Sequence, residues 1–343
     1  MTVGLTDDTK RSSVPQDGIR RALPQWMTSR WVSFAFSALV LHATIAAIDP
    51  VAVNNPLQGD LADGAKGAGV VRAQILLGRA HFSCGEIDGT FGSNFQKALN
   101  AFQGERKLPV TGALDAATWS ALHLDTAPAL IDYTITPMDL KGPFAPTPAG
   151  MEAQAKLTYL GYDSPLEELG ERFHSSPELL QALNPGANFE QAGQQLTVPN
   201  VHAVPRPRAA SIVVSKSESS VRAYDASGRL LAFFAATIGS EHDPLPIGEW
   251  KIKRVFHNPK FYYDATLFWN AKGSDKEVLP PGPNNPVGPV WIDLSREHYG
   301  IHGTPEPGKV GHASSHGCIR LTNWDALALA AMVRPGTPAT LKE

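Results

Sequence analysis

The apolar pattern of this chain changes near Ala210, and that change limits the folds open to it. Before Ala210, apolar residues recur every three or four positions, as on the buried faces of helices. After it, short runs such as Gly248–Arg254 and Val290–Leu294 are separated by turn residues, which predicts β-strands. Since domains usually hold about 100 to 200 residues, the 343 residues are expected to form a multidomain α+β protein.

The first 47 residues have the pattern of an export signal. A lead with basic residues, ending at Arg30, precedes the apolar run Trp31–Ile48, which ends in small residues. This order predicts a signal peptide or a membrane anchor over residues 1–47. Met27 is an alternative start to Met1 and would leave a short basic lead. Either outcome places the remaining chain outside the cytoplasm, in the periplasm or cell wall, with the anchor as its only membrane contact.

The charge balance argues against a nucleic-acid-binding protein, and the cysteine content argues against a protein held by a disulfide framework. The 30 Lys and Arg residues nearly balance the 33 Asp and Glu residues, so nothing predicts the clustered basic face that nucleic acid requires. Only two cysteines occur, Cys84 and Cys318, too few for a disulfide framework. Both are expected to be free thiols, with Cys84 buried in a core.

Residues 65–124 are predicted to form a small helical bundle. Helical spacing covers residues 70–77, 93–106 and 115–122, with glycine-marked turns between them. The stretch resembles the peptidoglycan-binding helical repeat, which implies binding to glycan strands. Four segments carry the resemblance: Ile87–Gly92, Ala98–Gln103, Leu108–Leu114 and Thr118-Trp119.

A proline-rich linker and a second small unit are expected next. Residues 125–150 contain five prolines and predict a semi-extended spacer. Residues 155–200 then contain two short helices, an Asn-Pro-Gly break and a closing strand. This order resembles the LysM module, a βααβ unit that binds N-acetylglucosamine glycans. Tyr162–Pro165 stands where that family has Gly-Asp, so a spacer role stays open.

One cysteine near the C-terminus lies among three histidines. Cys318 follows His302, His312 and His316 within a short span. A thiol attacks as the thiolate, so it requires a base such as imidazole. His302 and His316 could each supply it. The same residues could ligate zinc, but that needs helical spacing of His312 and His316, and the small residues around them favour a loop. We therefore expect no metal.

Residues 209–343 resemble the L,D-transpeptidase catalytic domain. His302-Gly-Thr, followed after a gap by Ser315–Arg320, is similar to the signature of that family. Three further segments agree with it: Pro246–Trp250, Pro280–Gly288 and Tyr299–His302. The resemblance implies a mainly β, sandwich-like domain, no cofactor, and a cysteine nucleophile that acts on peptidoglycan stem peptides.

The resemblance also implies roles for single residues. Cys318 matches the nucleophile and His302 the general base, which the Gly303 carbonyl orients. His316 matches a second histidine that lines the site. The amides of Gly317 and Cys318 are placed to stabilise the oxyanion.

Two more residues are expected next to the substrate. The Arg320 guanidinium could hold a carboxylate of the stem peptide, and Ser315 forms the turn beside it. The implied reaction releases D-alanine from a tetrapeptide stem and leaves a thioester on Cys318. The acceptor stays open: a neighbouring stem, an envelope lipoprotein, or water in a carboxypeptidase. A wall-binding protein without catalysis is the non-enzyme alternative.

Overall fold

The computed structural model describes residues 47–201, 207–267, 276–313 and 317–343. These residues belong to one compact unit, Thr44–Glu343. The predicted signal peptide or anchor lies outside the described residues, except at Ala47. Within the described ranges, no helix has both the length and the apolar character needed to cross a membrane.

A helical region comes first, as predicted. The apolar faces of its three longer helices meet in one core, and the Asp115 carboxylate caps the last helix by accepting from the Thr118 amide at 2.8 Å. Cys84 is buried in this core, as expected, and its thiol is free. The elements are α1 (Pro50–Asn54), α2 (Ala68–Arg79), β1 (Phe82–Ser83), α3 (Ser93–Glu105) and α4 (Ala116–Leu122).

The next region is a βααβ unit with a long insertion. Strands β2 (Leu130–Thr134) and β3 (Gln195–Pro199) pair antiparallel, and helices α6 (Pro165–Arg172) and α7 (Pro177–Leu183) lie between them in the chain. The hydroxyls of Ser164 and Ser176 cap the two helices, as their positions predict. Helix α5 (Met151–Ala155) lies within the insertion, which we define as residues 135–164.

The predicted spacer at 125–150 is wrong in one respect, because β2 lies inside it. Pro128 and Pro137 flank this strand rather than interrupt it, so every residue from Leu130 to Thr134 can join the β2–β3 ladder. The first strand of the βααβ unit therefore comes before the insertion and not at residue 155. The resemblance to LysM stays a prediction.

The C-terminal region is built on one curled sheet, as the alternating pattern predicts. The sheet order is β1-β6-β5-β4-β14-β8-β11-β12-β13-β7. Only Ala236 separates β6 from β7, although they lie near opposite ends of this order, so the sheet curls back on itself. The strands are β4 (Ser211–Ser215), β5 (Ser220–Tyr224), β6 (Leu230–Ala235), β7 (Thr237–Ile238), β8 (Gly248–His257), β11 (Val290–Leu294), β12 (Gly300–His302), β13 (Ile319–Arg320) and β14 (Pro338–Lys342).

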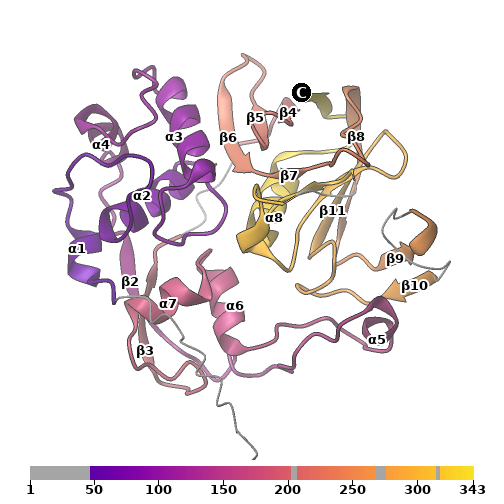
Figure 1. The fold of residues 1–343 in the computed structure, drawn as a ribbon, viewed down its shortest axis with the longest axis horizontal. Helices are drawn as coiled ribbons and strands as arrows, with labels where there is room; N and C mark the ends of the chain where they lie inside the picture. Colours follow the sequence, from indigo (N-terminus) through magenta and orange to yellow (C-terminus); the bar gives the residue numbers. More distant parts are fainter. Residues whose placement is uncertain (1–46, 202–206, 268–275, 314–316) are drawn as a thin grey trace, which may run out of the picture. The chain divides into compact units, whose positions relative to one another are not determined.

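One helix and one hairpin complete this region. Helix α8 (Asn323–Met332) packs on β11, and the Thr322 hydroxyl caps it by accepting from the Asp325 amide at 3.3 Å. The hairpin of β9 (Phe261–Asp264) and β10 (Lys276–Leu279) contacts α5. Figure 1 shows α5 beside this hairpin, joined to α6 by a long extended connection.

The helical region extends the sheet through β1. Phe82 and Ser83 pair in parallel with Phe233 and Phe234 of β6. The Phe233 side chain is fully buried in the core of the helical region, whereas Phe234 points to the core of the sheet. The two regions therefore share both a sheet and a hydrophobic core.

Candidate active site

Two short parallel strands bring the predicted nucleophile and base together. In the register of β12 and β13, Ile301 pairs with Ile319 and His302 with Arg320. Both isoleucines are fully buried in the sheet's core. Since side chains alternate along a strand, His302, Arg320 and Cys318, which directly precedes β13, face the opposite side.

The ring of His302 is held in one orientation. It is 3% exposed and stacks on Trp291 with 5.3 Å between ring centres. Its Nδ1 lies 2.7 Å from the carbonyl oxygen of Gly303, which can only accept a hydrogen bond. Nδ1 therefore carries the proton, and Nε2 keeps the lone pair that a general base needs.

Burial keeps this pair uncharged at rest. It lowers the pKa of His302 to about 3, and the positive charge of Arg320 adds to that effect. Burial also raises the pKa of the Cys318 thiol, although a hydrogen bond with the Gly300 backbone and the Arg320 charge oppose the rise. At neutral pH the site therefore holds a thiol and a neutral imidazole.

Glycine at position 303 is required by a close neighbour. A Cβ added there would lie 2.2 Å from Oδ1 of Asn323, the first residue of α8, and a Cβ on Gly288 would meet the same atom at the same distance. The amide of Asn323 thus lies directly against the backbone that orients His302.

A buried carboxyl from the βααβ unit holds this amide. Asn323 donates through Nδ2 to Glu171 of α6 at 2.7 Å and to the Pro283 carbonyl at 3.1 Å. Burial raises the pKa of Glu171 to about 8. A helix outside the sheet region therefore reaches the start of α8.

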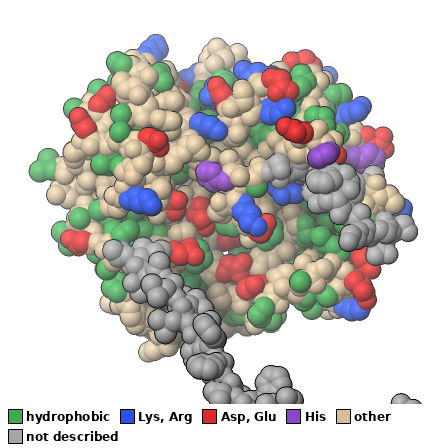
Figure 2. Space-filling model, in the orientation of Figure 1, with side chains coloured by type: hydrophobic (Ala, Val, Ile, Leu, Met, Phe, Trp, Pro, Cys, Tyr) green, Lys and Arg blue, Asp and Glu red, His purple; other side chains and the backbone are tan. Residues whose placement is uncertain are grey.

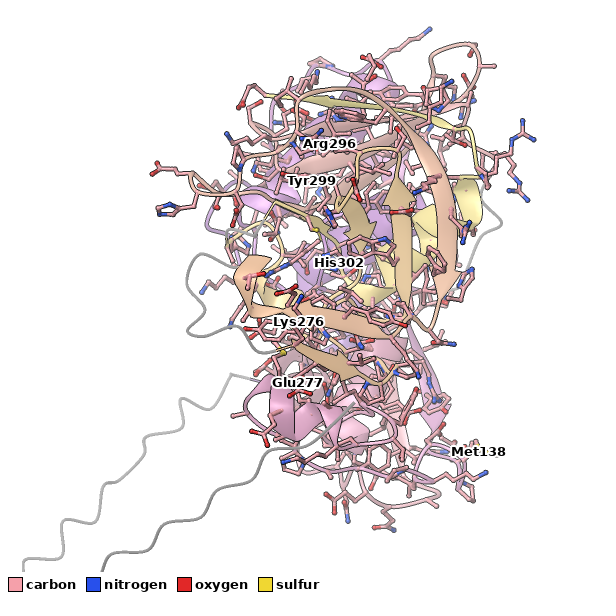
Figure 3. The ribbon with its side chains drawn as sticks, turned by 90° about the vertical axis from the view of Figure 1, so that its right-hand side faces the viewer. Met138, Lys276, Glu277, Arg296, Tyr299 and His302 are labelled. Carbon is pink, nitrogen blue, oxygen red and sulfur yellow. The ribbon has the colours of Figure 1, made fainter. Side chains whose placement is uncertain are left out.

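The turn before β13 requires glycine for conformational reasons. Gly317 has φ +89°, and an added Cβ would meet the Tyr299 ring at 3.0 Å. The Cys318 Sγ lies 3.9 Å from the carbonyl oxygen of His298. Ser315 and His316, the other two residues predicted for this turn, lie outside the described residues. In the view of Figure 3, His302 lies between Tyr299 and the hairpin residue Lys276.

Arg320 lies where the site opens into a cleft. The cleft has a volume of about 420 Å³, and Arg320, Thr304 and Asn284 form part of its wall. Thr147, Gln154 and Asp163 of the insertion and Glu167 of α6 also line it. Among the residues that the structure describes, no group of three or more His, Cys, Asp or Glu side chains is placed to hold a metal ion.

Sequence reasoning missed the residues that surround the predicted centre. Glu171 and Asn323 carry no motif of their own, and only their contacts reveal them. One signal was available in the segment Pro280–Gly288, where Gly282 approaches the Leu160 carbonyl and Gly288 approaches Asn323. Both glycines have positive φ and leave no space for a Cβ.

Two family models match the chain. The model of the L,D-transpeptidase catalytic domain, YkuD, matches residues 209–341. The model described as "Putative peptidoglycan binding domain" matches residues 66–122.

Comparison with known proteins finds relatives that are named as L,D-transpeptidases. "Putative L,D-transpeptidase YkuD" of Bacillus licheniformis is 32% identical over 178 residues, which are 51% of this chain and 92% of the relative. "Probable L,D-transpeptidase YbiS" of Escherichia coli is 27% identical over 184 residues, 52% of this chain and 60% of the relative. The solved L,D-transpeptidase of Xylanimonas cellulosilytica is 15% identical, with a TM-score of 0.35 over 84% of this chain and 99% of that chain.

The Bacillus relative, matched over nearly its whole length, decides the assignment. This chain belongs to the L,D-transpeptidase family and carries an N-terminal peptidoglycan-binding domain.

Proposed function

We propose that this protein is a peptidoglycan L,D-transpeptidase in which Cys318 is the nucleophile and His302 the general base. The observation that supports this most is the shared face of β12 and β13, where the thiol directly precedes β13 and the oriented imidazole ends β12. The Gly303 carbonyl fixes the tautomer of His302, so no acidic side chain is needed as the third member of a triad.

In the first half-reaction the thiol attacks the peptide carbonyl that precedes the terminal D-alanine of a tetrapeptide stem. The proton of Cys318 passes to Nε2 of His302 as the S–C bond forms. The C–N bond then breaks, and His302 gives the proton to the leaving D-alanine amine. The amides of Gly317 and Cys318 stabilise the oxyanion, and a donor of that kind contributes about 3 to 4 kcal/mol.

In the second half-reaction an acceptor amine attacks the thioester. The N–C bond forms, the C–S bond breaks, and His302 moves one proton from the amine to the Cys318 sulfur. With a neighbouring stem as acceptor, the product is a 3→3 cross-link. An envelope lipoprotein or water would take the same place and give anchoring or carboxypeptidase activity.

Binding to the wall fits the rest of the chain. The helical domain at 66–122 supports peptidoglycan as the partner, and peptidoglycan lies outside the cytoplasmic membrane. A signal peptide or anchor at residues 1–47 would deliver the protein to that compartment. His316 and Ser315 would line the site together with Arg320.

Defined disaccharide tetrapeptides test this function. The wild type is expected to release D-alanine, and Cys318→Ala is expected to release none while it still sediments with purified peptidoglycan. Cys84→Ala is the matched thiol control and keeps the activity. D-alanine release by Cys318→Ala at the wild-type rate would refute the mechanism. Separating dimers from tripeptides identifies the acceptor.

A further inference from the structure

The segment between β12 and β13 is held from two sides. We call its residues 307–313 the 307–313 loop. On one side of this loop, the Gly311 amide donates to Oγ1 of Thr237 on β7 at 2.8 Å. Thr237 pairs with Arg320 in the register of β7 and β13. This side therefore ties the loop to the strand that directly follows Cys318.

The other side of the loop is held by Asn94, a residue of α3 in the peptidoglycan-binding domain. Its Nδ2 donates to the Val310 carbonyl at 2.7 Å and lies 3.3 Å from Nε2 of His312. Because a carbonyl oxygen can only accept, the contact with Val310 determines which end of the Asn94 amide faces the loop. Asn94 is 8% exposed and Val310 is 2% exposed, so this hydrogen bond is shielded from water.

Two glycines of the loop leave room for side chains of the peptidoglycan-binding domain. A Cβ on Gly311 would lie 2.2 Å from Oδ1 of Asn94, and Gly311 has φ +77°. A Cβ on Gly308 would lie 3.1 Å from Oε2 of Glu86. In Figure 2, acidic side chains gather over the middle of the face shown, where the helical region and the sheet region meet in Figure 1. Polar groups of the helical region therefore approach the loop closely.

The Asn94 hydrogen bond is not needed to join the two regions. They already share the sheet through β1 and a hydrophobic core around Phe233. The backbone hydrogen bonds described for the 307–313 loop form local turns. Among the described residues, the hydrogen bonds that orient the loop come from Thr237 and Asn94. We therefore expect loss of the Asn94 donor to affect the loop more than the attachment of the domain.

We propose that Asn94 is a positioning residue for the active site, a side chain of the peptidoglycan-binding domain that holds the 307–313 loop and thereby the place of Cys318. The proposal rests on the proposed function, because it concerns how Cys318 meets His302. A misplacement of about 1 Å can lower a rate about 10²-fold. The catalytic domain matched at residues 209–341 is then not sufficient for full activity, since a side chain outside it supports the active site.

Asn94→Asp tests this role in the full chain with a defined disaccharide tetrapeptide. The aspartate keeps the size of the side chain but presents a carboxylate oxygen, in place of the donating Nδ2, to the Val310 carbonyl. We expect kcat for D-alanine release to fall at least roughly tenfold. KM should stay within about twofold, because the cleft at Arg320 is unchanged. Since Asn94 is buried, sedimentation with purified peptidoglycan should not change.

Gln96→Glu is the matched control, because it makes the same change from amide to carboxylate on the same helix. Gln96 is partly exposed and lies beside Gly112 of its own domain, and residues two apart on a helix do not share a face. It should keep the wild-type kcat. A kcat within twofold of the wild type in Asn94→Asp overturns the proposal, as does an equal fall in both variants. Lost sedimentation with unchanged kcat assigns Asn94 to wall binding and also overturns it.

Hydrogen exchange followed by mass spectrometry tests the placement of the loop without turnover. In Asn94→Asp, the amides of the 307–313 loop should exchange faster, while those of β11 keep the wild-type rate and show that the sheet is folded. Unchanged exchange in the loop overturns the proposal. If the wild type releases no D-alanine, the proposed function fails, and the exchange rates still decide whether Asn94 holds the loop.

Discussion

At the scale of single residues, the protonation state of His302 decides how the thiol is activated. Burial lowers the pKa of the imidazole and raises the pKa of the thiol, so both groups are neutral at rest. The site therefore does not hold a stable thiolate–imidazolium pair. In the proposed mechanism, attack and proton transfer are then coupled. The positive charge of Arg320 favours the anionic sulfur and disfavours the imidazolium.

Titration of His302 checks directly whether its imidazole is neutral at rest. Its folded pKa of about 3 lies below the usual value of about 6.5. The unfolded chain therefore binds the extra proton first, and His302 lowers the stability of the fold as pH falls from about 6.5 toward 3. In ¹⁵N NMR spectra, the imidazole signals that disappear in His302→Gln should keep neutral, Nδ1-protonated shifts from pH 8 to pH 5. A protonation midpoint near pH 6.5 contradicts the prediction.

The same substitution has an expected effect on rate. His302→Gln leaves the thiol without a base and should lower the rate of D-alanine release by about 10² to 10⁴, the usual contribution of general base catalysis. Wall binding should not change, since residues 66–122 lie in another region of the chain. A rate within a factor of two of the wild type would assign the base elsewhere, with His316 as the next candidate.

At the scale of elements, the contact between α6 and α8 links the βααβ unit to the site. Glu171 accepts from Asn323, which lies against Gly303, whose carbonyl orients His302. Tyr162 also donates to Glu171, at 3.4 Å. This carboxyl favours its protonated form because it is buried.

Glu171 makes the stability of the fold depend on pH. Its folded pKa of about 8 lies above the unfolded value of about 4.3. The contribution of Glu171 to the free energy of unfolding is full below the unfolded pKa. It is lost as pH rises toward 8, by up to about 1.4 kcal/mol per pH unit. The free energy of unfolding, measured with urea at pH 5, 6, 7 and 8, should fall with pH less steeply in Glu171→Gln than in the wild type. Exposed Glu190→Gln is the control, and parallel curves for wild type and Glu171→Gln contradict the prediction.

Elements with a strong local pattern could be predicted from the sequence, and elements that depend on distant partners could not. Helices α3, α4, α6 and α7 and the strands after Ala210 follow from apolar spacing and capping residues. Strand β2 was hidden because its prolines suggested a spacer and its partner β3 lies some 60 residues later. The nucleophile and base carry a motif, whereas the cleft is formed by the insertion, which no local pattern connects to the catalytic domain.

At the scale of the whole molecule, the helical region and the catalytic sheet depend on each other. Strand β1 covers the edge of β6, and the core of the helical region buries Phe233 completely. Ser83 of β1 also donates to Asp325 of α8 at 2.7 Å. The peptidoglycan-binding domain is therefore part of the structural support of the catalytic domain.

Removing the N-terminal regions should expose this edge. A fragment of residues 207–343 presents an unpaired β6 strand with an apolar Phe233, features that favour association between chains. Light scattering should show oligomers of this fragment and monomers of the same fragment with Phe233→Lys, because a lysine on an edge strand opposes pairing. A monomeric fragment with the melting temperature of the full chain would contradict the shared core.

The central claim is that Cys318 carries the acyl group of the stem peptide. Mass spectrometry of the intact protein, mixed rapidly with a disaccharide tetrapeptide and quenched in acid, tests it most directly. We expect a mass increase equal to the substrate minus D-alanine, located on the peptide with Cys318 and absent from Cys318→Ala. Turnover without any adduct, or an adduct on buried Cys84, would contradict the mechanism.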